Sequence, residues 1–511
     1  MRRYELPIFL IVISAAIAGC ARSSLYMAPE RADRPWIPAV TAGGEIVPGE
    51  AGSTQPSTNG YVLPSNPALG TIPPPPSGLV AQHPYSLPEL IDVAQSANPL
   101  TRIAWDDARN AALAAGVARS IYLPNLSAAI VGGYRNSRSR NSLLDTKSED
   151  DLTAKGTISS LSLQWLLFDF GQRSAVLDAA KQNSVITNIA FTAAHQEMIY
   201  KVSLAFYANA AARAHVTTAA KALSNAKEVQ TAAEDRYSHG VGTVIEVAEA
   251  KQATAQAKFV QIQAIGVEQN TYLSLLAAMG VSPLTKIAIA DISNRKLSGA
   301  MTGSITEFVM AALARRPDTL TAYAAHEASL ANLRAARAEF LPKLFVAATG
   351  SYTTGGLDVT GVPGAAQQQS TYNLSPRGLG ATVLLGVTIP LYDGGRRDAV
   401  LEQARANADK SAAAMTEIRN EAIREIVEAG NAAKTGIAAY DAAEALASAT
   451  RTTFDAALQS YRHGVGSITA VTNAETQMLL AENSATDAYN DALSAAATLA
   501  LSAGTLGAAP Q

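Results

Sequence analysis

The feature that most restricts the fold of this chain is an internal duplication. Three short motifs occur twice, in the same order, and the last two pairs have the same spacing. The pairs are YLPNL at 122–126 with FLPKL at 340–344, LFDFGQR at 167–173 with LYDGGRR at 391–397, and YSHGVG at 237–242 with YRHGVG at 461–466. The sequence therefore predicts two similar repeats, over residues 85–304 and 305–503, followed by a tail at 504–511.

Proline and glycine positions predict the helices of each repeat. Pro124 and Pro342 each end a helix expected to run for about 35 residues. Residues 172–237 and 396–461 contain no proline, so each is expected to form one helix of about 65 residues, roughly 100 Å long. Helices of about 36 residues then return over 243–279 and 467–502. Each long helix should therefore face two shorter helices stacked end to end, forming an antiparallel rod.

Two strands are expected between the first and the long helix of each repeat. Apolar residues alternate with polar ones at Leu161, Leu163, Trp165 and Leu167, and residues 383–391 repeat the pattern. The earlier strands are expected to begin near Asn125 and Lys343. Polar or Gly-rich stretches at 141–154 and 355–375 are expected to be exposed hairpin loops. The predicted order in each repeat is helix, strand, strand, long helix, helix.

The N-terminus has the pattern of an export signal with a lipid attachment site. Arg2 and Arg3 precede an apolar stretch in residues 1–19, which ends before Cys20, the only cysteine of the chain. We expect Cys20 to carry the lipid anchor; the alternative is a buried cysteine in an ordinary signal segment. Residues 20–84 are rich in Pro, Gly, Ser and Thr, and are expected to form a lipidated linker.

Composition and motifs argue against several classes of function. A formal net charge of −3 without a long basic run disfavours nucleic acid as a partner. The chain has no Gly-rich phosphate loop ending in Lys-Ser/Thr, and no Ser, Cys or His constellation for nucleophilic catalysis. Asp169 and Asp393 fit helix caps better than catalytic carboxylates. We expect no enzymatic activity, no cofactor, no catalytic residue and no metal site.

Four strands per chain cannot close a membrane barrel. The open edges would leave backbone N–H and C=O groups unpaired in lipid, so the chain is expected to oligomerise. Bacterial barrels need at least about eight strands. A homotrimer with twelve strands is the smallest assembly that also leaves a central passage.

Together the signal, the cysteine, the duplicated element order and the paired turns resemble the TolC family of outer-membrane efflux proteins, in its OprM-like (NodT-type) lipoprotein branch. The resemblance covers about residues 85–503. It implies a mainly α fold with membrane β structure: a trimeric 12-stranded β-barrel, four strands per chain, continuous with a long periplasmic α-helical barrel. It also implies an exit duct in the outer membrane, extending into the periplasm. That duct passively exports what an inner-membrane pump and a periplasmic adaptor hand over.

The same resemblance places the adaptor contact at the two glycine turns. The residues concerned are Gly240, Val241, Gly242, Gly464, Val465 and Gly466. Glycine allows close backbone approach by a partner. The alternative is a tight helix–turn–helix link that needs a positive φ at Gly240 and Gly464, and both interpretations can hold together.

A periplasmic gate is also implied near the second turn, where Tyr461 matches a tyrosine of the family. The positions for the usual Arg and two Asp hold Gly466, Ala470 and Asn473 instead. Glu246 and Glu249, near the first turn, are candidate replacements; their alternative is an ordinary solvated helix face.

His239 and His463 occupy equivalent turns, where a trimer would gather six imidazoles. Helix capping or solvent exposure is favoured there over a metal or pH site. The rival to the channel hypothesis is a non-conducting, lipid-anchored coiled-coil scaffold lipoprotein of the periplasm. Such a scaffold has no need for four amphipathic strands. An adaptor is a further rival, but adaptors resemble one hairpin flanked by β domains. The exported substrate is not indicated by the sequence.

Overall fold

In the computed structural model, the chain divides into two compact units, Met1–Pro75 and Pro76–Gln511. The predicted signal segment and Cys20 lie outside the described residues. In the first unit, two short 3-10 helices, η1 (Ser24–Met27) and η2 (Pro67–Gly70), accompany an isolated bridge between Val40 and Ile46. The residues that the structure describes are 24–29, 32, 36–50, 52, 62–72, 74–76, 79–143, 146–291, 304–355 and 378–507, with the backbone alone for 24–25 and 135–154.

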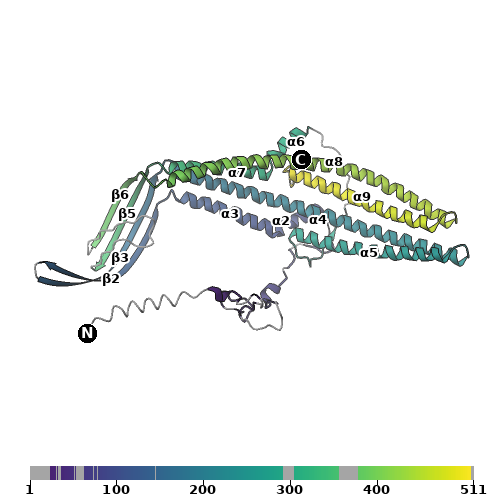
Figure 1. The fold of residues 1–511 in the computed structure, drawn as a ribbon, viewed down its shortest axis with the longest axis horizontal. Coiled ribbons are helices and arrows are strands. Elements are labelled where there is room, and N and C mark those ends of the chain that lie inside the picture. The colour runs from purple at the N-terminus through teal and green to yellow at the C-terminus, as the bar shows by residue number, and fades with distance from the viewer. Residues whose placement is uncertain are drawn as a thin grey trace. The chain divides into compact units, whose positions relative to one another are not determined.

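The second unit contains the two repeats in the predicted order (Figure 1). The first repeat follows the short strand β1 (Pro84–Tyr85). It runs through α2 (Leu87–Ala97), α3 (Pro99–Ser120), β2 (Asn125–Leu143), β3 (Thr146–Phe168), α4 (Gln172–Ser238) and α5 (Val244–Met279). After β4 (Ala288–Ile289), the second repeat runs through α6 (Ile305–Leu313), α7 (Pro317–Ala338), β5 (Lys343–Gly355), β6 (Gly378–Thr388), α8 (Arg396–Arg462) and α9 (Ile468–Ser502).

The predicted long helices are confirmed. α4 and α8 each contain 67 residues. The returning helices α5 and α9 contain 36 and 35 residues. They begin after Thr243 and Ser467, whose side-chain oxygens accept the backbone N–H of the third helical residue. Each repeat therefore ends in a long antiparallel hairpin.

The prediction of one helix of about 35 residues before each strand pair was wrong. The helix is broken at Pro99 in the first repeat and at Pro317 in the second. The preceding residues, Asn98 and Arg316, have extended backbone because proline excludes the helical conformation there. Each break divides the segment into a short helix, α2 or α6, and a 22-residue helix, α3 or α7.

The same two residues join the broken helices to the hairpins. Asn98 donates its side-chain amide to the carbonyl of Ala278 at the end of α5, at 3.1 Å. Arg316 donates to the carbonyl of Ser502 at the end of α9, at 3.0 Å. These bonds satisfy carbonyl groups that a helix C-terminus leaves unpaired. The stacked arrangement expected from the sequence is therefore present, with α3 following α5 and α7 following α9.

The four long strands form one antiparallel sheet in the order β2-β3-β5-β6. β2 and β6 are its edges. The expected loop at 141–154 was wrong, because β2 continues to Leu143 and β3 begins at Thr146. Most of the other predicted loop, residues 356–375, lies outside the described residues. Among the described helices, none is both long and apolar enough to cross a membrane.

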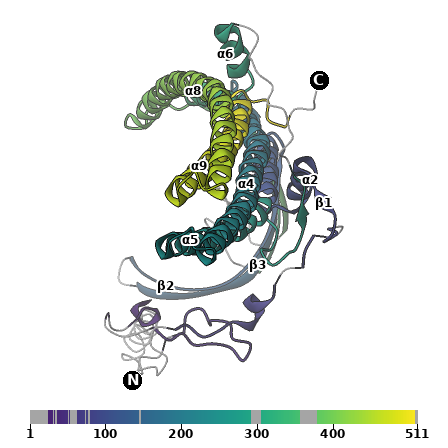
Figure 2. The ribbon, with the colours of Figure 1, turned by 90° about the vertical axis from the view of Figure 1, so that its right-hand side faces the viewer.

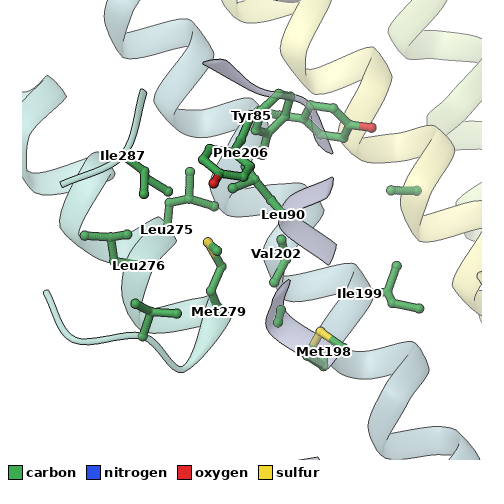
Figure 3. Packing of buried hydrophobic residues seen from close by; sticks show 14 of the residues in the cluster. Tyr85, Leu90, Met198, Ile199, Val202, Phe206, Leu275, Leu276, Met279 and Ile287 are labelled. Atoms are coloured by element: carbon green, nitrogen blue, oxygen red, sulfur yellow. The ribbon is translucent and has the colours of Figure 1, made fainter. Parts of the chain in front are cut away.

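The main core lies where α2 packs against the middle of the helical layer (Figure 3). One face of α4 is apolar and buried there, at Ile199, Val202 and Phe206. They meet the end of α5 at Leu275, Leu276 and Met279, and α2 at Leu90. Figure 2 shows α2 and β1 on the convex side of the curved helical layer.

Candidate functional site

The two hairpin tips have the same backbone structure. In the first, the N–H groups of Val241 and Gly242 both donate to the carbonyl of Arg236, at 3.0 Å. In the second, Val465 and Gly466 donate to Ser460 with the same distances. Gly240 and Gly464 have φ values of +74° and +79°, a region that strongly favours glycine. The predicted positive-φ turns are therefore confirmed.

The last glycine of each turn is required by close packing. A Cβ on Gly242 would lie 2.9 Å from the backbone nitrogen of Tyr237, and one on Gly466 would lie 3.0 Å from that of Tyr461. The valine between the glycines points outward, and the side chain of Val465 is 83% exposed. Each tip thus presents one apolar side chain on a tight backbone turn.

Tyr461 is packed inside the second tip. It is 0% exposed and belongs to a cluster with Phe454 and Leu458 of α8 and Ile468 and Val471 of α9. Burial raises the pKa of its phenol. The cluster also contains residues of the first hairpin, namely Val229, Ala233 and Ala250. Tyr461 therefore packs in a cluster that joins the two hairpins.

Arg236 of α4 covers Tyr461, and sequence reasoning missed this contact. Its guanidinium carbon lies 5.0 Å from the centre of the Tyr461 ring, a favourable cation–π distance. It also donates to the carbonyl of Tyr461 at 3.4 Å and to that of Val241 at 3.2 Å. A second arginine, Arg462 of α8, forms an ion pair with Glu228 of α4. Two arginines thus connect the hairpins at the tips.

The acidic gate candidates lie beside these contacts. Glu246 forms a capping box with Thr243: it accepts the N–H of Thr243 at 3.3 Å and donates its own N–H to the Thr243 hydroxyl at 3.2 Å. Glu249 accepts the hydroxyl of Thr469 at 3.5 Å, which links α5 to α9. Glu246 is thus the third residue of a helix start, whereas Glu249 lies between the hairpins.

His239 closes the first long helix. Its Nδ1 lies 2.8 Å from the carbonyl oxygen of Asp235 and 3.2 Å from the hydroxyl of Ser238. These contacts fit the capping role favoured from the sequence. In the part of the chain that the structure describes, no group of three or more His, Cys, Asp or Glu side chains is arranged to hold a metal ion.

The two repeats also share the geometry of the corners where a strand meets the long helix. Asp169 accepts the backbone N–H of Arg173 at 2.9 Å, and Asp393 accepts that of Arg397 at 3.2 Å. The predicted capping role of both aspartates is confirmed. Each also pairs with the arginine side chain, at 2.9 Å and 2.7 Å.

The corner arginines bring two of the repeated motifs together. Arg173 lies over the ring of Tyr122 at 4.7 Å and donates to the carbonyls of Leu166 and Leu167. Arg397 lies over the ring of Phe340 at 5.4 Å. Both arginines stood in the repeated motifs, but their role was not foreseen. Each fixes the end of a strand to the end of one helix and the start of another.

Comparison with known proteins agrees with this duplicated architecture. A family model described as outer membrane efflux protein matches the chain twice, over residues 90–281 and 309–505. The chain belongs to this family. The two matched segments contain the two hairpins and the four-stranded sheet.

Individual relatives cover most of the chain. CyaE of Bordetella pertussis is 27% identical over 388 residues, which is 75% of each protein. AprF of Pseudomonas aeruginosa, an alkaline protease secretion protein, is 25% identical over 76% of this chain and 78% of its own length. The crystal structure of the outer membrane protein VceC from Vibrio cholerae is 21% identical, with a TM-score of 0.67 over 82% of this chain and 96% of VceC.

Family membership fixes the general class and place of the protein. It is an outer-membrane transport protein of the TolC type, extends into the periplasm, and is not an enzyme. Its fold is that of these channels: a mainly helical, internally duplicated chain with a four-stranded sheet.

Proposed function

We propose that the protein is the exit duct of a tripartite efflux or type I secretion system, and that three copies form the duct. The observation that carries this proposal is the pair of open edges in one chain. β2 and β6 each have one neighbour within the described sheet, so each leaves a row of backbone groups unpaired. Pairing β6 of one copy with β2 of the next removes every edge. Three copies then give the twelve-stranded barrel.

The helical layer has matching open edges. α4 packs against α7 and α9, which join the repeats within one chain. α8 is the equivalent of α4 in the second repeat, so the face of α8 that corresponds to this contact has no such partner within the described chain. At the other edge of the helical layer, α3 and α5 have exposed apolar side chains. Those side chains include Leu113 and Val117 of α3 and Phe259 and Ile262 of α5. Such a surface is expected to be covered by another copy.

The tips are the proposed contact with a periplasmic adaptor. Each tip, Gly240-Val241-Gly242 and its equivalent Gly464-Val465-Gly466, offers an exposed valine between two glycines. A helical hairpin of a partner can approach such a backbone closely. An inner-membrane pump supplies the energy, because transport through the duct itself is passive in this proposal.

The tip is also the proposed gate. Tyr461 and Glu249 lie in contacts between the hairpins, and Glu246 stabilises the adjacent helix start. Opening the duct requires the hairpins to separate, so these contacts must break. We add Arg236 and Arg462 to the proposed gate residues, because both connect the hairpins.

The lipid anchor at Cys20 remains a proposal from the sequence. It would hold the start of the mature chain at the outer membrane, and the Pro-rich segment after it is long enough to act as a tether. The exported substrate is a small molecule or a polypeptide, since AprF is an alkaline protease secretion protein and the matching family is that of outer membrane efflux proteins.

The function is tested by single-channel recording in planar bilayers with the purified protein. The proposal predicts a small, stable conductance that rises when Arg236→Ala and Arg462→Ala remove the contacts between the hairpins. Thr231→Ala, on the exposed side of the same helix, is the matched control and should leave the conductance unchanged. A protein that never conducts would favour the anchored scaffold.

A further inference from the structure

Glu475 is a buried carboxylate in the apolar seam of the second hairpin. It is 7% exposed, and its Oε1 has no hydrogen-bond partner among the described residues. Val471 and Met478, one helical turn before and after it, are buried on the same face of α9. A charge in such surroundings is costly unless it is paired or neutralised. This residue plays no part in the turns or corners described above.

The equivalent position in the first hairpin shows which kind of partner Glu475 lacks. In the first hairpin, Lys251 of α5 pairs with Glu234 of α4 at 3.5 Å. The same register in the second hairpin places Glu475 opposite Leu458 of α8. The second hairpin thus carries an acid at the position of the lysine, and leucine at the position of its partner.

The charged side chains near this level are engaged elsewhere or lie in solvent. On α8, Asp455 is exposed. The buried residues of α4 in this part are apolar, and include Ala222, Ala226 and Val229. Burial is the sole cause of the shift that raises the pKa of Glu475 to about 7. The engaged pairs are Arg462 with Glu228, Arg451 with Glu482, and Lys251 with Glu234.

We propose that Glu475 is a proton-dependent switch for the periplasmic end of the duct, an inference that rests on the proposed function of the tip as a gate. The neutral carboxyl stays packed between α8 and α9. The ionised carboxylate requires water, and water enters the seam beside Leu458. Because Leu458 and Tyr461 belong to the cluster that joins the hairpins, loosening the seam weakens the closed tip.

The direction of the effect follows from the pKa. The packed state binds the proton of Glu475 more tightly than the loosened state, in which the carboxyl has its ordinary pKa near 4.5. The packed seam is therefore most stable below about pH 4.5, and it loses stability as the pH rises to about 7. Ionisation changes from about one in ten molecules at pH 6 to about nine in ten at pH 8. We expect the tip to open more readily at the higher pH.

The test compares the full-length wild type with Glu475→Gln by two measurements between pH 6 and pH 8. The first is open probability in planar bilayers. The second is hydrogen exchange of the 468–480 backbone in detergent, corrected for the intrinsic pH dependence of exchange. In the wild type, we expect protection to fall and open probability to rise several-fold, by up to about tenfold per pH unit below about pH 7 and little further above it. Both should be nearly constant in Glu475→Gln.

Two further variants separate the ionisation of Glu475 from other changes in the second hairpin. Glu475→Met places an apolar side chain that cannot ionise beside Val471 and Met478, and should remove the pH response while retaining a folded hairpin. His215→Gln removes a histidine that contacts Asn483 and Asp487 of α9, and should leave the response of Glu475 intact.

The outcomes distinguish failure of the proton-dependent switch from failure of the proposed duct. Equal pH responses in the wild type and Glu475→Gln would overturn the switch, as would a wild type whose protection does not change. If the wild type never conducts but its protection falls only while Glu475 is present, the gate function fails and the proton-dependent loosening stands.

Discussion

The two hairpin tips share a motif and a backbone, yet they place the same tyrosine in opposite environments. Tyr237 of the first tip is 52% exposed, whereas Tyr461 of the second is fully buried. The difference comes from the neighbouring hairpin, since Arg236 of α4 covers Tyr461 and the second tip provides no such arginine at Ser460. Duplicated sequence therefore fixes the turn, while contacts between the repeats decide what each copy does.

The largest expected difference between the tips comes from removing these tyrosine rings. Tyr461→Ala should lower the local free energy of opening by about 3–5 kcal/mol, because it leaves a cavity in a packed cluster. Tyr237→Ala is the matched control and should change it by less than about 0.5 kcal/mol. Native-state hydrogen exchange of the tip residues measures both. Equal losses would show that the two tips are energetically alike.

The corners where a strand meets a long helix allow a second comparison of the two repeats. Arg173 and Asp169 are both buried, whereas Asp393, the partner of Arg397, is a quarter exposed. Removing one member of a buried pair costs about 3–5 kcal/mol, so Arg173→Met should destabilise the start of α4 by about that amount. Arg397→Met should cost the start of α8 less, because water reaches Asp393. Exchange rates of the first turns of α4 and α8 compare the two. A larger loss at Arg397 would contradict this ranking.

The two repeats should behave alike at the first glycine of each turn. Gly240→Ala and Gly464→Ala each force a side chain into a left-handed conformation, which costs roughly 1–2 kcal/mol. Thermal unfolding of each variant, followed by circular dichroism, should show similar small losses. Gly116→Ala, in a helix with open space around the added methyl group, is the control and should be neutral or stabilising. A large loss of stability for only one tip glycine would mean that the two turns contribute differently to stability.

The smallest expected effect concerns the ion pair of the first hairpin. Lys251 and Glu234 are both exposed, and such pairs contribute only about 0.2–1 kcal/mol. Lys251→Ala should therefore hardly change hydrogen exchange of α5, and the change should shrink further in high salt. A loss above about 2 kcal/mol would exceed what an exposed pair supplies and would contradict the contrast with Glu475.

Much of the fold was predictable because it depends on local sequence. The absence of proline predicted α4 and α8, and Thr243 and Ser467 mark the starts of the returning helices. The helix breaks were missed although Asn98-Pro99 is a local signal: Asn98 caps α3 by accepting the N–H of Leu100. The prediction used only Pro124 and Pro342, at the ends of the two segments, and took no account of the earlier prolines.

The site was less predictable, since its contacts join residues far apart in sequence. Arg236 reaches Tyr461 across 225 positions, and Tyr237 and Tyr461 both stand two residues before the same His-Gly-Val-Gly turn. Arg173 and Arg397 stood in the repeated motifs, but their role depends on Tyr122 and Phe340, which come from another motif. Only the fold brings these motifs together.

The most direct test of the central claim is the number of chains in the assembly, measured by native mass spectrometry of the detergent-purified protein. The open edges of the sheet and of the helical layer predict three chains. A stable species of one or two chains, with β2 and β6 still unpaired, would contradict the duct.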